Sequence, residues 1–168
     1  ILPAGLGARD TLRLEMGYPL YGFELDEATT PVEAGLHRRF VALGKPGFIG
    51  GETLARQAAE GVSRTLVGLE ITGSGIPRTG YEVALEGKTV GSVTSGTMSP
   101  SLKKGIGMAY VTPDLSRPGT ELDVIIRGRP TGARVVKTPF YDRKEACDVT
   151  EETGKLYRTG LSGHKPGI

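Results

Sequence analysis

The feature that most constrains this chain is a series of short apolar runs, separated by glycine and proline, that begins after Gly61. Such runs, rich in β-branched residues and bounded by turn residues, are typical of β-strands. Residues 86–88, Glu-Gly-Lys, predict a tight hairpin turn between two of them. Short strands at this spacing predict a small closed or nearly closed antiparallel barrel. The predicted strands are residues 65–71, 82–85, 89–95, 107–111, 121–126 and 131–137.

Before the barrel, the sequence has a helical character. Residues 11–16 follow a possible cap at Asp10 and stop at Gly17, which predicts a short helix. Residues 51–61 combine strong helix formers with glycine at both ends, and they predict a second helix. The helical part therefore ends where the apolar runs begin, and we place a domain boundary near residue 61.

A third segment, residues 30–36, allows two interpretations. Thr30 as a cap, Pro31 at the first helical position and Glu33 three residues after the cap form the pattern of a capping box. Gly35 could equally end the segment as a turn. The fold class that we predict is α+β, mainly β, with a short helical end of a preceding domain followed by a small antiparallel Greek-key β-barrel.

Composition excludes several classes of protein. A hydrophobic share of 38% and a charged share of 24% fit an ordinary soluble chain, and no apolar run suggests a membrane span. The net charge is +2 and the basic residues are scattered, so we expect no nucleic-acid partner. A single cysteine, Cys147, allows no intramolecular disulfide and favours a reducing, cytoplasmic compartment. The sequence after Ile1 has no signal peptide, and we expect the chain to be a fragment.

The sequence does not indicate a complete active site within this chain. The two histidines, His37 and His164, lie far apart without metal-ligand spacing, and we expect them at the surface or at a cap. Residues 95–99, Ser-Gly-Thr-Met-Ser, contain candidate nucleophiles but no placed base, and we expect a loop between strands. The glycines of residues 68–75 do not follow the order of a phosphate-binding loop. We therefore predict neither a catalytic residue nor a metal site.

The order of several sequence blocks is more informative than the composition. Residues 7–15 read Gly-Ala-Arg-Asp-Thr-Leu-Arg-Leu-Glu, and residues 75–83 read Gly-Ile-Pro-Arg-Thr-Gly-Tyr-Glu-Val. Together with further blocks in the same order, they resemble successive motifs of the glycine cleavage system T-protein, or aminomethyltransferase, family over about residues 5–141. The further blocks are residues 20–22, 30–36, 45–54, 93–102 and 135–141.

The resemblance implies a three-domain ring with tetrahydrofolate in its central opening. Residues 1–61 would be the C-terminal remnant of the central folate-binding domain, residues 62–144 the C-terminal β-barrel domain, and residues 145–168 a poorly ordered tail. The family transfers a methylene unit from an aminomethyl group, carried on the lipoyl arm of H-protein, to tetrahydrofolate and releases ammonia. Its essential aspartate lies in the first domain, so the resemblance implies that this chain alone is inactive.

Two residues match positions that contact folate in the family, and a third lies just after a segment that the family often follows with a ligand-contacting residue. Arg9 belongs to the Ala-Arg-Asp motif, and its guanidinium suits a polar ring edge or a carboxylate. Tyr18 can pack against the pterin or benzoyl ring while offering one hydrogen bond. Arg143 follows the Pro-Phe-Tyr segment, where a solvated charge is the alternative. Arg9 could instead pair with Asp10 or Glu15, and Tyr18 could pack under a loop.

Three other functions compete with this interpretation. A related family that repairs iron–sulfur clusters needs a cysteine where this chain has Gly47. The folate-binding C-terminal portion of a sarcosine or dimethylglycine oxidising enzyme shares the same architecture, and only an attached flavin domain would separate the two. A non-catalytic folate-fold binding module is the third alternative. The chain also has no tryptophan, which family members often carry after residue 36, where it reads His-Arg-Arg-Phe.

Overall fold

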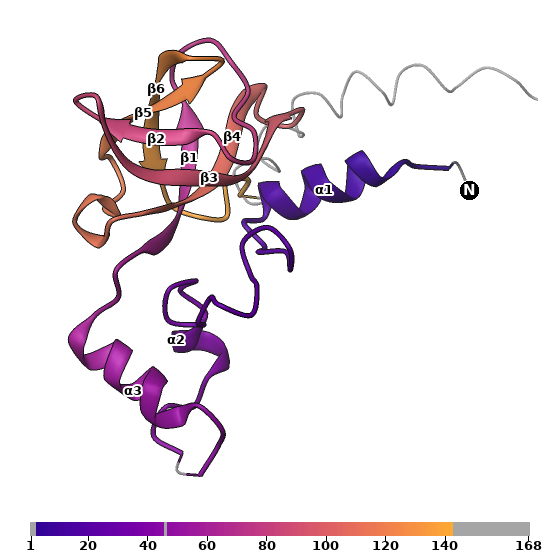
Figure 1. Ribbon diagram of the computed structural model, residues 1–168. Coiled ribbons are helices and arrows are strands. Elements are labelled where there is room, and N and C mark those ends of the chain that lie inside the picture. The colour runs from indigo at the N-terminus through magenta and orange to yellow at the C-terminus, as the bar shows by residue number, and fades with distance from the viewer. Residues whose placement is uncertain (1–2, 46, 143–168) are drawn as a thin grey trace, which may run out of the picture.

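The structure is a computed structural model that describes residues 3–45 and 47–142. A β-barrel occupies one end of the molecule, and a helical segment runs alongside the barrel and then away from it (Figure 1). The predicted folate contact Arg143 and the predicted tail of residues 145–168 lie outside the described residues.

Six antiparallel strands close into the barrel in the order β1-β4-β3-β2-β5-β6. Hairpins connect β2, β3 and β4 in succession, and β4 pairs on its other side with β1. This is the Greek-key arrangement that we predict from the sequence. Pairing of β1 with β6 completes the closure, so no strand edge stays open. The strands are β1 (Thr65–Ile71), β2 (Glu82–Leu85), β3 (Lys88–Ser99), β4 (Lys104–Val111), β5 (Glu121–Ile126) and β6 (Arg129–Val136).

Alternate residues of the strands fill the barrel with aliphatic side chains, as the period of a strand requires. A short 3₁₀ helix, η1 (Pro113–Leu115), lies in the connection between β4 and β5, and Leu115 packs against the barrel core. The buried members of that core are Val67, Leu69, Ile71, Val83, Val93, Ala109, Val111, Leu122, Val124, Ala133 and Val135.

The predicted bounds of β1, β2 and β5 agree with the structure, whereas β3 and β4 are longer than predicted and β6 begins and ends slightly earlier than predicted. We expected residues 95–99 to form a loop, and this was wrong, because Ser95 to Ser99 pair with Met108 to Lys104 across the β3–β4 ladder. The strand is covered by another part of the chain at Gly96. A Cβ on Gly96 would lie 2.3 Å from the Pro77 carbonyl oxygen, so the β1–β2 connection packs directly on the strand.

The hairpin between β2 and β3 has the geometry that its sequence predicts. Glu86 and Gly87 both have positive φ angles, 50° and 77°. Two successive residues of this kind make the type I′ turn, whose twist matches that of the flanking strands.

The helical segment contains three helices, α1 (Leu6–Glu15), α2 (His37–Phe40) and α3 (Gly51–Glu60). The prediction of α3 is confirmed. The first helix begins earlier than expected, and Asp10 lies inside it rather than capping it, because its side chain pairs with Arg13. Residues 30–36 form a turn, as Gly35 at a φ of 70° allows, although Thr30 and Glu33 still make both bonds of a capping box.

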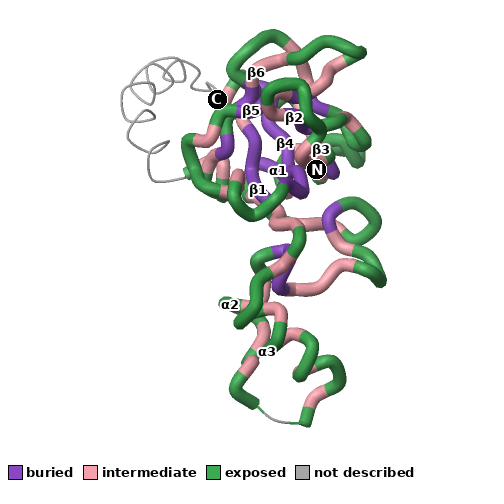
Figure 2. Tube along the Cα trace, turned by 60° about the vertical axis from the view of Figure 1, so that its left-hand side comes forward, coloured by how far each residue is buried: buried purple, intermediate pink, exposed green. Residues whose placement is uncertain are grey.

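The three helices differ in their contact with the barrel. Leu14 of α1 is fully buried against Ile106 and Met108 on the outer face of β4. By contrast, α3 has no buried residue, and it lies with α2 beyond the barrel (Figures 1 and 2). The part of the segment that the barrel holds in place is therefore α1 and the turns that follow it.

Candidate functional site

A buried ion pair joins α1, the turn after it and β3. Arg13 Nη1 donates to Glu24 Oε2 at 2.7 Å, and the exposed fractions of the two side chains are 10% and 0%. Glu24 also accepts the Leu20 N–H at 2.9 Å and the Thr94 hydroxyl at 2.8 Å. Arg13 Nη2 donates to Ser95 Oγ at 2.7 Å. Both carboxylate oxygens are satisfied, as a buried charge requires.

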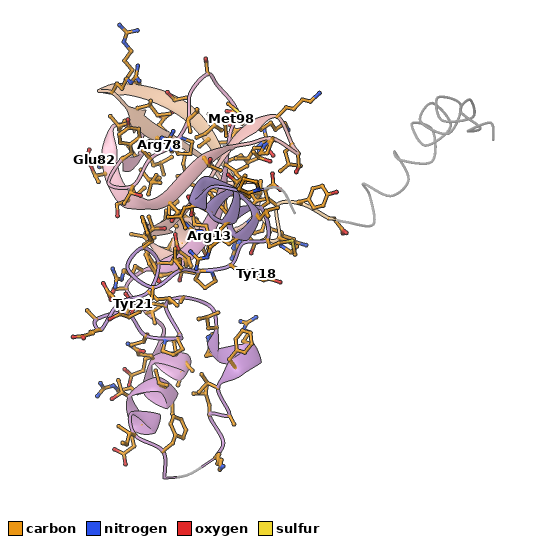
Figure 3. All side chains as sticks on the ribbon, turned by 90° about the vertical axis from the view of Figure 1, so that its right-hand side faces the viewer. Arg13, Tyr18, Tyr21, Arg78, Glu82 and Met98 are labelled. Carbon is orange, nitrogen blue, oxygen red and sulfur yellow. The ribbon has the colours of Figure 1, made fainter. Side chains whose placement is uncertain are left out.

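The same arginine fixes the backbone where the first helix ends. Arg13 donates through Nε to Asp10 Oδ1 at 2.8 Å and through Nη1 to the Tyr18 carbonyl oxygen at 3.3 Å. On the other side, the Tyr110 hydroxyl of β4 donates to the Glu24 carbonyl oxygen at 2.9 Å. The turn that carries Tyr18 is therefore tied to both the helix and the barrel (Figure 3).

A second buried carboxylate holds the C-terminal end of α1. Glu15 is 3% exposed, and it accepts hydrogen bonds from the hydroxyls of Ser99 and Ser101. Its backbone carbonyl accepts the N–H groups of Phe140 and Tyr141 at 2.9 and 3.1 Å. This glutamate therefore joins α1 to the β3–β4 connection and to the segment that follows β6.

A third carboxylate, Glu33, joins the turn before α2 to the start of β1. Arg64 donates to it at 2.9 Å and stacks over the Tyr110 ring at 4.6 Å. Burial alone would raise the pKa of Glu33, but the Thr30 N–H and the Arg64 guanidinium outweigh burial and hold that pKa below its ordinary value. Burial raises the pKa of Tyr110 to about 12.

A cavity of about 790 Å³ opens between this anchored turn and the barrel. Tyr18 lies on its wall with 59% of its surface exposed, and Arg38 is the charged residue among those that line it. The volume is within the range of about 300–1,000 Å³ that is usual for small-molecule sites. Most of the wall is apolar, and the side chains that make it so include Met16, Pro19, Pro31, Leu36, Phe40, Leu66 and Met108.

Of the predicted folate contacts, only Tyr18 lines this cavity among the described residues. Tyr18 lies on the wall of this cavity rather than under a loop. Arg9 is exposed on α1 and is not among the lining residues. The acids that it could have paired with have other partners, since Asp10 binds Arg13 and Glu15 binds the two serines. Contact with folate stays a prediction for Arg9, Tyr18 and Arg143.

Arg13 and Glu24 were not predicted as site residues from the sequence. The spacing of Asp10 and Arg13 is that of an ion pair on one helix face, which is a local signal. Glu24 stands between Phe23 and Leu25, and an acid in such surroundings is a candidate for burial. Nothing local, however, indicates that the two residues meet.

The described residues contain neither a membrane-spanning helix nor a group of side chains suited to a metal ion. None of the helices in residues 3–45 and 47–142 is long and apolar enough to cross a membrane. Within the same residues, no group of three or more histidine, cysteine, aspartate or glutamate side chains could hold a metal ion.

Comparison with known families matches both parts of the chain. A family model described as the glycine cleavage T-protein C-terminal barrel domain matches residues 64–142, and one described as the GCVT N-terminal domain matches residues 1–45. The barrel and the helical segment thus define a chain of the glycine cleavage T-protein type, in which the end of one domain leads into a C-terminal barrel domain.

Individual relatives agree with these matches. The aminomethyltransferases of Halothermothrix orenii and Symbiobacterium thermophilum are 51% and 53% identical over 140 and 143 residues. These alignments cover 83% and 84% of this chain, but only 39% and 38% of the relatives. A crystal structure of the glycine cleavage system aminomethyltransferase T from Bartonella henselae superposes with a TM-score of 0.76 at 34% identity, over 82% of this chain and 39% of that one. The chain belongs to the glycine cleavage T-protein family.

Proposed function

We propose that this chain is the C-terminal part of an aminomethyltransferase of the glycine cleavage system. The complete enzyme transfers a methylene unit from the aminomethyl group on the lipoyl arm of H-protein to tetrahydrofolate, and ammonia is released. The relatives described above carry the name aminomethyltransferase, which favours this activity over the sarcosine or dimethylglycine oxidising alternative. We place the reaction in the cytoplasm, with H-protein and tetrahydrofolate as the partners.

In this proposal the two parts of the chain belong to two different domains of the complete enzyme. Residues 1–61 supply the end of the central folate-binding domain, and residues 62–144 supply the C-terminal barrel domain. The essential aspartate of the family belongs to a part of the enzyme that this chain does not match. We therefore expect no aminomethyl transfer by the 168 residues alone.

The observation that carries the proposal is the position of Tyr18. Its ring is exposed on the wall of a largely apolar cavity of about 790 Å³, while its backbone is fixed by Arg13. An aromatic side chain packs well against a flat pterin or benzoyl ring, and tyrosine has only two side-chain torsion angles to order on binding. The fixed backbone makes Tyr18 a preorganised contact.

Arg9 plays a separate part. Arg9 is exposed on α1, and its guanidinium makes no hydrogen bond or ion pair within the described residues. It is therefore available to a ligand that approaches along the helix, and a fork of donors suits a carboxylate or a polar ring edge. We assign Arg143 a similar contact from its place in the family motif.

The test is a chimeric enzyme in which this chain replaces the matching segment of the Symbiobacterium thermophilum aminomethyltransferase. With lipoylated H-protein carrying an aminomethyl group, the chimera is expected to form methylene-tetrahydrofolate. The 168-residue chain alone, assayed at the same concentration, is the matched comparison and is expected to form none.

Two results would contradict the proposal. A folded chimera that binds H-protein but forms no methylene-tetrahydrofolate would remove the aminomethyltransferase assignment. Product formation by the chain alone would instead show that it contains a complete active site, contrary to the proposal that the essential aspartate lies in another part of the enzyme.

A further inference from the structure

Basic side chains gather at one end of the barrel. The strand pairing places the β1–β2, β3–β4 and β5–β6 connections together at this end, because β1, β3 and β5 all finish there. These connections and the strand ends beside them carry Arg78, Lys103, Lys104, Arg127 and Arg129. Of the five, only Lys104 has an acidic partner within the described residues, Glu70 at 2.6 Å.

Three of these cations surround one cavity of about 650 Å³. Arg78, Arg127 and Arg129 line it together with Ser74, Thr131 and Tyr81, and no acidic residue is part of the lining. All three arginines are exposed, and none has a hydrogen bond or ion pair in the part of the chain that the structure describes.

Other arginines of the chain, by contrast, form ion pairs with acidic residues. Arg13, Arg64 and Arg134 each bind a carboxylate, at distances between 2.7 and 3.1 Å. Glu82 follows Tyr81 in the chain, but it does not line the cavity, and it accepts the Thr89 hydroxyl at 3.3 Å. The cavity therefore has an uncompensated positive charge.

Backbone contacts hold the two loops that form the cavity. The N–H groups of Thr72 and Gly73 donate to the Gly132 carbonyl oxygen at 2.9 and 3.3 Å, so the β1–β2 connection is fixed to β6. Gly75 lies directly on the β5–β6 hairpin, because a Cβ there would come within 2.7 Å of Ile126 Cδ1. The arginines thus project from neighbouring loops that are joined to each other.

We propose that this cavity binds a small oligoanion that carries two or more phosphate or carboxylate groups. Like charges around one cavity repel each other, and a bound anion removes that repulsion. Guanidinium groups bind phosphate and carboxylate oxygens through paired, charge-assisted hydrogen bonds. The hydroxyls of Ser74, Thr131 and Tyr81 add neutral donors to the same wall.

This site is independent of the proposed folate site. The cavities beside Tyr18 and beside Arg78 have no lining residue in common. Arg78 belongs to the barrel loops, whereas Tyr18 lies beside the end of α1 (Figure 3). Failure of the aminomethyltransferase proposal would leave the anion site unaffected.

The test is calorimetric titration of the 168-residue chain with inorganic pyrophosphate and, separately, with citrate at low ionic strength. We expect saturable binding of at least one of them. Arg78→Gln and Arg127→Gln should each weaken that binding about tenfold to a hundredfold, which corresponds to one charge-assisted hydrogen-bonding group. The control is Arg117→Gln, since Arg117 is exposed in the β4–β5 connection at the opposite end of the barrel.

Three results would overturn the proposal. Equal weakening by Arg117→Gln and Arg78→Gln would show that only the net charge matters. Absence of binding to pyrophosphate and citrate, with circular dichroism showing a folded barrel, would exclude the small-anion site. Binding of a polyglutamate peptide but of neither small anion would assign this end of the barrel to an acidic protein surface instead.

Discussion

Removal of Arg13 should destabilise the chain more than removal of any exposed arginine. In Arg13→Ala the Glu24 carboxylate loses its charged partner while its side chain remains fully buried. The same substitution removes the donors to Ser95 Oγ, Asp10 Oδ1 and the Tyr18 carbonyl oxygen. It also removes the guanidinium that lies 5.8 Å from the centroid of the Phe23 ring.

The expected magnitude follows from what remains around Glu24. Breaking a buried ion pair by removing one partner costs about 3–5 kcal/mol, because the other charge is left uncompensated. The Leu20 N–H and the Thr94 hydroxyl still bind Glu24 in the variant, so we expect the lower end, about 3 kcal/mol. For a chain of this size, that corresponds to a fall in melting temperature of roughly 6–12 °C.

The assay is urea unfolding followed by circular dichroism and by tyrosine fluorescence, since the chain has six tyrosines and no tryptophan. Arg134→Ala is the matched control. Arg134 also binds a glutamate, Glu121, but 51% and 78% of the two side chains are exposed, and such pairs contribute about 0–1 kcal/mol. The double variant Arg13→Ala/Glu24→Gln should lose less than the sum of the single variants, because it leaves no buried charge.

One result would refute this reasoning. If Arg13→Ala and Arg134→Ala lower the free energy of unfolding by the same amount, the Arg13–Glu24 pair is energetically equivalent to an exposed one. The buried network would then not determine where Tyr18 lies.

Three further predictions address the ligand, the packing and the pH dependence. In the chimera, Tyr18→Ala should raise the Michaelis constant for tetrahydrofolate several-fold to about tenfold and Tyr18→Phe much less, because the ring supplies most of the contact; equal effects would contradict this. Gly96→Ala should lower the melting temperature, because its Cβ would lie 2.3 Å from the Pro77 oxygen, whereas Gly7→Ala, with nothing within 4 Å, should not. Tyr110 has a folded-state pKa raised from 10.0 to about 12, so stability should fall as the pH rises between these values; Tyr110→Phe should show a smaller fall in urea unfolding.

The fold was predictable where local signals were strong. Residues 65–71, 82–85 and 121–126 are short β-branched or aliphatic runs between turn residues, and the structure has β1, β2 and β5 within the same bounds. Residues 95–99 lack that signal. They form part of β3 because Gly96 admits the β1–β2 connection and because Ser95 and Ser99 bind Arg13 and Glu15, contacts that only the folded chain creates.

The candidate site was less predictable for the same reason. Tyr18 and Arg9 were inferred from a resemblance, and their own sequence neighbours do not distinguish them from other exposed residues. Arg13 binds a serine 82 positions away, and Glu24 binds a threonine 70 positions away. Separations of this length along the sequence cannot be inferred from the period of a helix or a strand. These contacts become visible only when the register of β3 is known, because Thr94 and Ser95 must lie opposite the helical segment.

The position of the buried glutamates explains how a small barrel can orient a helical segment that has little core of its own. Glu15, Glu24 and Glu33 all come from that segment, and their donors Ser99, Thr94 and Arg64 come from β3 or from the residue before β1. An apolar contact tolerates sliding, but a buried carboxylate that misses its donor costs free energy. Each glutamate therefore favours one docked position over its neighbours, and the turn that carries Tyr18 lies between two of them.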